Sequence, residues 1–304
     1  MDVRPIRQIL CPIDFSDFSR HALDHAIAIA HRHDARVTAV QVFVLAVEGA
    51  LFTGAAGLQP FTLNDANREQ LLARMRTFVE GEAGSQAAVD VIVRESNDVA
   101  SQILQEAQAL GADLLVIGTH GRSGFDRLVL GSVTEKILRK APCPVLTIPR
   151  RAPDAVPIGA APFTRILCGV DFSDCSLAAL SCAADFAGRG AEWLGVVHAI
   201  EVPPASYEGA NEYALAVLQA ELEEDAKTRF AQLLPGLDGG QFRKESIVVT
   251  DRSYKAILRI AREREADLIV LGVQGRGVLD RMLFGSTTNH VIRQATCPVL
   301  TIRT

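Results

Sequence analysis

The chain of 304 residues has few aromatic side chains, no excess of positive charge and no long uninterrupted apolar run. Aromatic residues make up 6% of the sequence, and the formal net charge is −5. This charge argues against broad electrostatic binding to nucleic acid or to an anionic membrane. The apolar stretch 37–58 is interrupted by Gln41, Glu48 and three glycines. We therefore expect a buried strand and an irregular loop there, and no membrane span.

Motifs for structural metals and for common catalytic reactions are also lacking. The six cysteines include no CxxC pair, and no Cys/His metal spacing is present. The sequence has no GxxxxGK[ST] loop, no kinase HRD set and no evident Ser-His-Asp elbow. Since the cysteines lie in or beside apolar runs, we expect reduced core residues of a cytoplasmic protein. The first strand begins almost at the N-terminus, so we expect no secretory signal.

What the chain does contain is a repeat of domain size. Residues 118–148 and 272–302 align without a gap, and 16 of 31 positions are identical. A second pair, ILCPIDFSD at 9–17 and ILCGVDFSD at 166–174, lies upstream. Solenoid repeats are only ~20–50 residues long, so this period indicates two domain-sized copies. We place them at 1–149 and 164–304, joined by the Pro-rich linker 150–163.

Apolar runs and helical periodicity alternate along each copy, which predicts alternating strands and helices. Strands that are apolar throughout indicate a parallel sheet covered on both faces. Right-handed crossovers then favour a doubly wound α/β domain. The strands are expected at 7–14, 37–44, 88–93, 114–118 and 144–148 in the first copy, and at 166–171, 193–199, 247–249, 268–272 and 298–302 in the second.

Polar and glycine residues follow the first and fourth strands, which should flank the point where strand order reverses and where ligands bind. Asp14 and Asp171 end the first strand of each copy. A carboxylate at this place could accept hydrogen bonds from ribose hydroxyls. The fourth strand ends in Gly-x-x-Gly, then nine residues, then Gly-Ser. These glycines let the backbone approach an anion closely, and the Gly-Ser opens a helix whose free N–H groups favour phosphate.

This pattern, followed by an apolar CPVLTI strand, resembles the universal stress protein family, and so does the opening ILCPIDFS. The resemblance covers nearly the whole chain and is to a tandem member of the ATP-binding type. It carries over to the following residues: Gly118, Gly121, Gly131 and Ser132 in the first copy, and Gly272, Gly275, Gly285 and Ser286 in the second.

The resemblance implies a five-stranded parallel sheet of the adenine nucleotide α-hydrolase-like type in each copy. It also implies that ATP, which we expect with Mg²⁺, binds with Asp14 and Asp171 facing the adenosine. Val42 and Ala199, at the end of the second strand, would then lie near adenine. Arg122 and Arg276 could contact the phosphates, or they could be solvated or paired with a neighbouring Asp.

The sequence departs from the family at one turn, before the third helix. Family members usually carry glycine there, whereas this chain has Asn97 and Asp251. Both residue types tolerate left-handed backbone better than most. The turn can therefore form without glycine.

Three functions stay open from the sequence. One is a cytoplasmic ATP-binding protein with a nucleotide-dependent role in stress or signalling. The second is a slow ATPase or self-phosphorylating enzyme on the same fold. The third is a tandem domain that binds a lipid-like ligand, for which residues 43–58 are the only support. The last strands, Val145–Ile148 and Val299–Ile302, are identical and apolar. We expect them to pair within one chain, and a homodimer of such chains is a further possibility.

Overall fold

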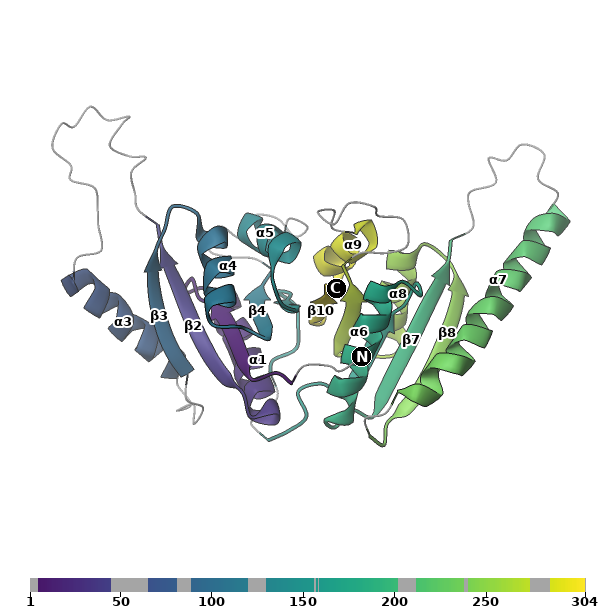
Figure 1. Ribbon diagram of the computed structural model, residues 1–304, viewed down its shortest axis with the longest axis horizontal. Coiled ribbons are helices and arrows are strands. Elements are labelled where there is room, and N and C mark those ends of the chain that lie inside the picture. The colour runs from purple at the N-terminus through teal and green to yellow at the C-terminus, as the bar shows by residue number, and fades with distance from the viewer. Residues whose placement is uncertain are drawn as a thin grey trace, which may run out of the picture. The chain divides into compact units, whose positions relative to one another are not determined.

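The computed structural model describes residues 5–44, 65–80, 89–119, 130–155, 157, 159–201, 212–237, 240–273 and 285–303 (Figure 1). The chain divides into two compact units. One is formed mainly by residues 5–150 and the other by residues 161–304. The domain and linker boundaries drawn from the sequence stay predictions.

The first half is a doubly wound α/β unit, as the sequence predicts. Its parallel strands lie in the order β3-β2-β1-β4-β5, so β1 and β4 are neighbours at the point where strand order reverses. The elements in chain order are β1 (Gln8–Pro12), α1 (Asp17–His33), β2 (Arg36–Phe43), α3 (Asp65–Glu80), β3 (Val89–Glu95), α4 (Val99–Ala109), β4 (Leu114–Gly118), α5 (Ser132–Lys140) and β5 (Val145–Ile148).

The second half repeats this arrangement. Its parallel strands lie in the order β8-β7-β6-β9-β10, with β6 beside β9. The elements are β6 (Arg165–Gly169), α6 (Asp174–Gly188), β7 (Trp193–Ile200), α7 (Glu212–Leu233), the short 3-10 helix η1 (Leu234–Gly236), β8 (Arg243–Thr250), α8 (Ser253–Glu263), β9 (Leu268–Gly272), α9 (Ser286–Gln294) and β10 (Val299–Ile302).

Each sheet is covered on both faces by helices whose buried stripe is rich in alanine and aliphatic residues. In the first half α1 packs on β1 and β4, while α4 packs on β2 and on α5. The central strand β4 is buried along its whole length, as expected for a strand with helices above and below. Ser16 and Ser173 cap the N-termini of α1 and α6, since each side chain accepts a hydrogen bond from the N–H three residues on.

Strand β8 is the clearest difference from the expected elements, because it begins at Arg243 and not at residue 247. Its first three residues are charged, and hydrophobic periodicity does not mark them. In the structure Glu245 accepts a hydrogen bond from Trp193 Nε1 at 3.0 Å and pairs with Arg264 at 2.7 Å. No helix among the described residues is long and apolar enough to cross a membrane.

Candidate functional site

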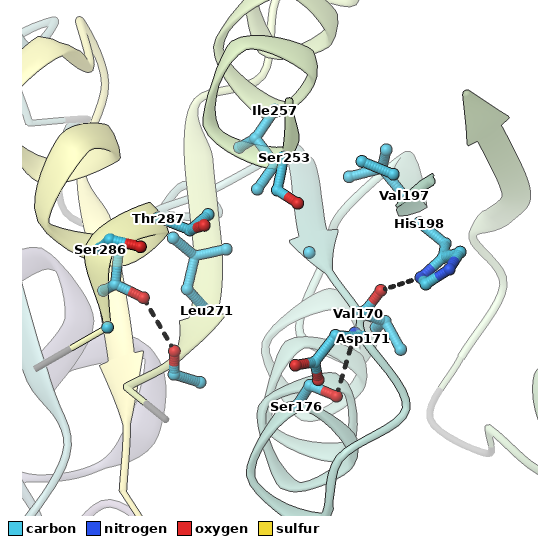
Figure 2. A pocket seen from close by; sticks show the side chains of 15 residues that line it. Val170, Asp171, Ser176, Val197, His198, Ser253, Ile257, Leu271, Ser286 and Thr287 are labelled. Atoms are coloured by element: carbon cyan, nitrogen blue, oxygen red, sulfur yellow. Dashed lines mark hydrogen bonds between the residues drawn. The ribbon is translucent and has the colours of Figure 1, made fainter. Parts of the chain in front are cut away.

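Each half has a pocket at the carboxyl ends of its central strands. The first pocket lies among the ends of β1, β2 and β4 and the starts of α4 and α5. The second lies at the matching place, among β6, β7, β9, α8 and α9 (Figure 2). Both therefore occupy the point where strand order reverses, the usual ligand position in a doubly wound sheet.

A carboxylate with a fixed orientation lines each pocket. Asp14 follows β1, and its Oδ1 accepts hydrogen bonds from the N–H and the hydroxyl of Ser16. Asp171 does the same with Ser173. Figure 2 shows the Asp171 carboxylate pointing into the pocket from the end of β6. The sequence placed the two acids at this strand end, but it did not show the serine contacts that orient them.

The residue after each aspartate has an unusual backbone conformation. Phe15 has φ 64° and Phe172 has φ 62°, the left-handed region that bulky residues rarely adopt. Such strain persists only where the surroundings hold it in place, and it gathers at functional sites. Phe15 packs edge-on against Phe78 of α3 with ring centroids 5.5 Å apart, and Arg74 lies over its ring.

The matching Phe172 is held by a similar cluster. Its ring centroid lies 5.2 Å from that of Phe230 in α7 and 4.8 Å from that of His198 in β7. His198 Nδ1 is 2.8 Å from the carbonyl oxygen of Val170, so the ring also contacts the backbone just after β6 (Figure 2). In both halves, aromatic packing from the helix after the second strand stabilises the turn that carries the carboxylate.

The helices α5 and α9 begin at the pockets with their first amides uncapped. Gly131 and Gly285 occupy the N-cap positions, and neither helix has a side-chain cap. The first N–H groups of a helix have no partner within the helix, and together with the helix dipole they favour an anion. The pockets therefore each present a row of backbone donors at the end where the sequence predicts phosphate.

Two threonines that the sequence reasoning missed fix these helix starts. Thr134 Oγ1 donates to the carbonyl oxygen of Gly118 at 3.0 Å, and Thr288 Oγ1 donates to that of Gly272 at 2.9 Å. Each threonine thereby ties the first turn of its helix to the end of the fourth strand. The signal was available, because Gly-Ser-x-Thr is identical in both copies.

The structure brings ten of the fourteen predicted site residues to the two pockets. Asp14, Val42, Gly118, Gly131 and Ser132 line the first pocket, and Asp171, Ala199, Gly272, Gly285 and Ser286 line the second. The other four, Gly121, Arg122, Gly275 and Arg276, lie outside the described residues.

Further lining residues come from helices α4 and α8, which the sequence reasoning did not assign to the site. Val99 and Ile103 line the first pocket, and Ser253 and Ile257 line the second. At the start of α4, Asp98 accepts hydrogen bonds from Lys136 and from the N–H of Ser101, and these contacts hold the pKa of its carboxyl well below the usual range. Among the described residues, no group of three or more His, Cys, Asp or Glu side chains could hold a metal ion.

Comparison with known proteins gives a consistent result for both halves. A model of the universal stress protein family matches residues 5–149 and again residues 162–303. The chain is 31% identical over 200 residues to a universal stress protein of Mycobacterium tuberculosis, which is 63% of this chain and 62% of that protein, less than two thirds of its length. It is 27% identical over 307 residues to one of Mycolicibacterium smegmatis, covering 97% of this chain and 96% of that one.

Solved structures show the same architecture. A putative universal stress protein of Pseudomonas aeruginosa superimposes with a TM-score of 0.65 and 20% sequence identity, covering 98% of this chain and 93% of that one. One from Archaeoglobus fulgidus gives a TM-score of 0.61 at 20% identity, with coverage of 97% and 98%. At this level of identity the likeness concerns the fold.

Proposed function

The chain belongs to the universal stress protein family, and we propose that it binds ATP with Mg²⁺ in both halves and has a nucleotide-dependent role in stress or signalling in the cytoplasm. The observation that carries this proposal is the uncapped start of α5 and of α9. Each lies in a pocket that also holds an oriented carboxylate.

The described residues fit a nucleotide from one end of the pocket to the other. At the phosphate end, the amides after Gly131 and the hydroxyl of Ser132 donate to phosphate oxygens. At the sugar end, Asp14 accepts hydrogen bonds from ribose hydroxyls, and its Ser16 contacts keep the carboxylate in place. Val42, at the end of β2, supplies apolar contact for the base. The second half repeats these roles with its matching residues.

The Mg²⁺ in this proposal arrives with the nucleotide. Magnesium usually keeps several waters and is held by one or two carboxylates together with substrate phosphates. Because Asp14 and Asp171 are assigned to the ribose, phosphate oxygens and water hold the ion in this proposal. The proposal concerns binding, and no catalytic residue is assigned. The segment behind the lipid hypothesis, residues 43–58, lies outside the described residues from residue 45 onward.

Calorimetry with two nucleotides tests the ribose contact. ATP is compared with an analogue that lacks both ribose hydroxyls, in the native chain and in Asp14→Asn with Asp171→Asn. Asparagine keeps an oxygen for the serine contacts but is a weaker acceptor. The native chain is expected to prefer ATP by about tenfold, the effect of a hydrogen bond to a charged group, and the variant is expected to lose most of this preference. Equal affinities in the native chain would contradict the assignment.

Pairing of the halves through Val145–Ile148 and Val299–Ile302, and association of two chains, stay predictions. If they pair, the amides of these strands that do not bond to β4 or β9 are also expected to be protected from hydrogen exchange. Sedimentation of the purified chain reports whether it is a monomer or a homodimer.

A further inference from the structure

At two matched positions, both at helix starts, a hydroxyl-bearing residue of the second pocket replaces a valine of the first. The first residue of α4 is Val99 and the first residue of α8 is Ser253. The second residue of α5 is Val133 and the second residue of α9 is Thr287. All four side chains line their pockets. The second pocket thus has two hydroxyls where the first has the methyl groups of valine.

The hydroxyls of the second pocket are available to a ligand. Figure 2 shows Ser253 and Thr287 pointing into the pocket from the starts of α8 and α9, on the side opposite Asp171. Within the described part of the chain, the side chains of Ser253, Ser286 and Thr287 form no hydrogen bond. The neighbouring Thr288 differs, because its hydroxyl already donates to the carbonyl of Gly272.

The two pockets do not differ in whether a carboxylate lies at the start of α4 or α8, because one lies there in both halves. In the first half Asp98 caps α4 and accepts from the N–H of Ser101. In the second half the N-cap residue is Arg252, which has no capping side-chain contact, and Glu201 at the end of β7 accepts from the N–H of Ser253 at 2.8 Å. At these helix starts, the difference that bears on an anion is the hydroxyl of the second half against the methyl groups of the first.

We infer that Ser253 and Thr287 are specificity-determining residues that make the second site prefer the more highly phosphorylated nucleotide more strongly than the first site does, where Val99 and Val133 occupy the matching positions. The inference rests on the proposed function, because it assigns a preference to the same two sites. Hydroxyls donate to phosphate oxygens, and hydrogen bonds to charged acceptors are the stronger ones. Valine offers only apolar contact, which is the same for a nucleoside monophosphate and a triphosphate.

The test measures the dissociation constants of ATP and AMP at each site in the full chain. Val42→Trp fills the first pocket, so that the measured constants are those of the second site. Ala199→Trp fills the second pocket and gives the constants of the first site. The ratio of the AMP constant to the ATP constant is expected to be at least about tenfold larger at the second site. Ser253→Val with Thr287→Val is expected to lower it to the value of the first site.

The reciprocal swap, Val99→Ser with Val133→Thr, is expected to raise the ratio at the first site. Each substitution introduces the residue that the other half has at the matching position. The variants are therefore expected to fold, and thermal unfolding checks this. If both nucleotides bind and the swaps leave the ratios unchanged, the inference is wrong and the proposed function stands. If neither nucleotide binds either site, both are wrong.

Discussion

Arg94 and Glu106 form a two-point ion pair, with Nε 2.6 Å from Oε1 and Nη2 3.1 Å from Oε2. Glu106 lies on α4 and is only 7% exposed, whereas the Arg94 side chain on β3 is 42% exposed. In the sheet Arg94 pairs with Val42, and the matching strand residue of the second half, Val249, pairs with Ala199. The matching helix residue is Ile260. The second half therefore has an apolar pair at this place.

This relationship predicts strong coupling between the two side chains. Arg94→Val leaves a buried carboxylate without its cation and is expected to destabilise the chain by about 3 kcal/mol. Arg94→Val with Glu106→Ile reproduces the pair of the second half and is expected to be near neutral, or stabilising. Denaturant unfolding of the single and double variants measures this. A double variant as unstable as Arg94→Val would contradict the prediction.

The left-handed backbone of Phe15 predicts a reversal of the usual order of glycine and alanine. Phe15→Ala and Phe15→Gly both remove the packing against Phe78, but only glycine relieves the strain at φ 64°. We expect the glycine variant to be more stable by about 1 kcal/mol. In the matched control at Phe78, inside α3, alanine is expected to be the more stable variant by a similar amount. The same order at both sites would show that Phe15 is unstrained.

The N-cap glycines of α5 and α9 differ in the room around them. A Cβ built on Gly285 lies 3.1 Å from the carbonyl oxygen of Val273, whereas one on Gly131 lies 3.4 Å from that of Thr119. The first contact is tighter than an ordinary one, and its partner is backbone. Gly285→Ala is therefore expected to lower the free energy of unfolding more than Gly131→Ala, as measured by urea unfolding. Equal losses of unfolding free energy in the two variants would contradict this prediction, because the start of α9 would then relieve the closer contact by a small shift.

The buried thiols predict a loss of stability in alkali. Burial raises the pKa of Cys143, Cys182 and Cys297 to about 12, and it raises the pKa of Cys11 and Cys168 as well. An unfolded thiol ionises near pH 8.5, so above this pH the unfolded state releases protons that the folded state keeps. Stability is therefore present below about pH 8.5 and falls above it, by up to roughly 1.4 kcal/mol per pH unit for each thiol.

Urea unfolding between about pH 8 and 9.5 measures this slope. Cys297→Ala, which removes one of the buried thiols, is expected to make it shallower. A free energy of unfolding that stays constant over this range would contradict the assignment of raised pKa values to the folded chain.

The sequence predicted the parts of the fold and site that both copies share. Strand β4 was found because every residue is apolar, and Asp14 and Gly131 were found because each recurs at the same place in the second copy. Only residues 247–249 of strand β8 were expected, because its first residues are charged. In the structure Glu245 accepts a hydrogen bond from Trp193, which lies 52 positions away in the sequence. Periodicity along the chain does not report such a contact.

Two features of the site left no usable signal in the sequence. Phenylalanine is not a residue type that suggests positive φ, so the strained turn at Phe15 and Phe172 could not be expected. Ser253 and Thr287 carry no such signal, because the other copy has valine at both places and only agreement between the copies marks the shared site residues. Only the fold brings the starts of α8 and α9 to one pocket.

The most direct test of the central claim is the number of ATP molecules that each chain holds. Native mass spectrometry of the full chain with Mg²⁺ and ATP is expected to show two nucleotides per polypeptide. Val42→Trp or Ala199→Trp, each of which fills one pocket, should leave one, and the double variant none. A folded chain that binds no ATP, or a double variant that still binds two, would contradict the account.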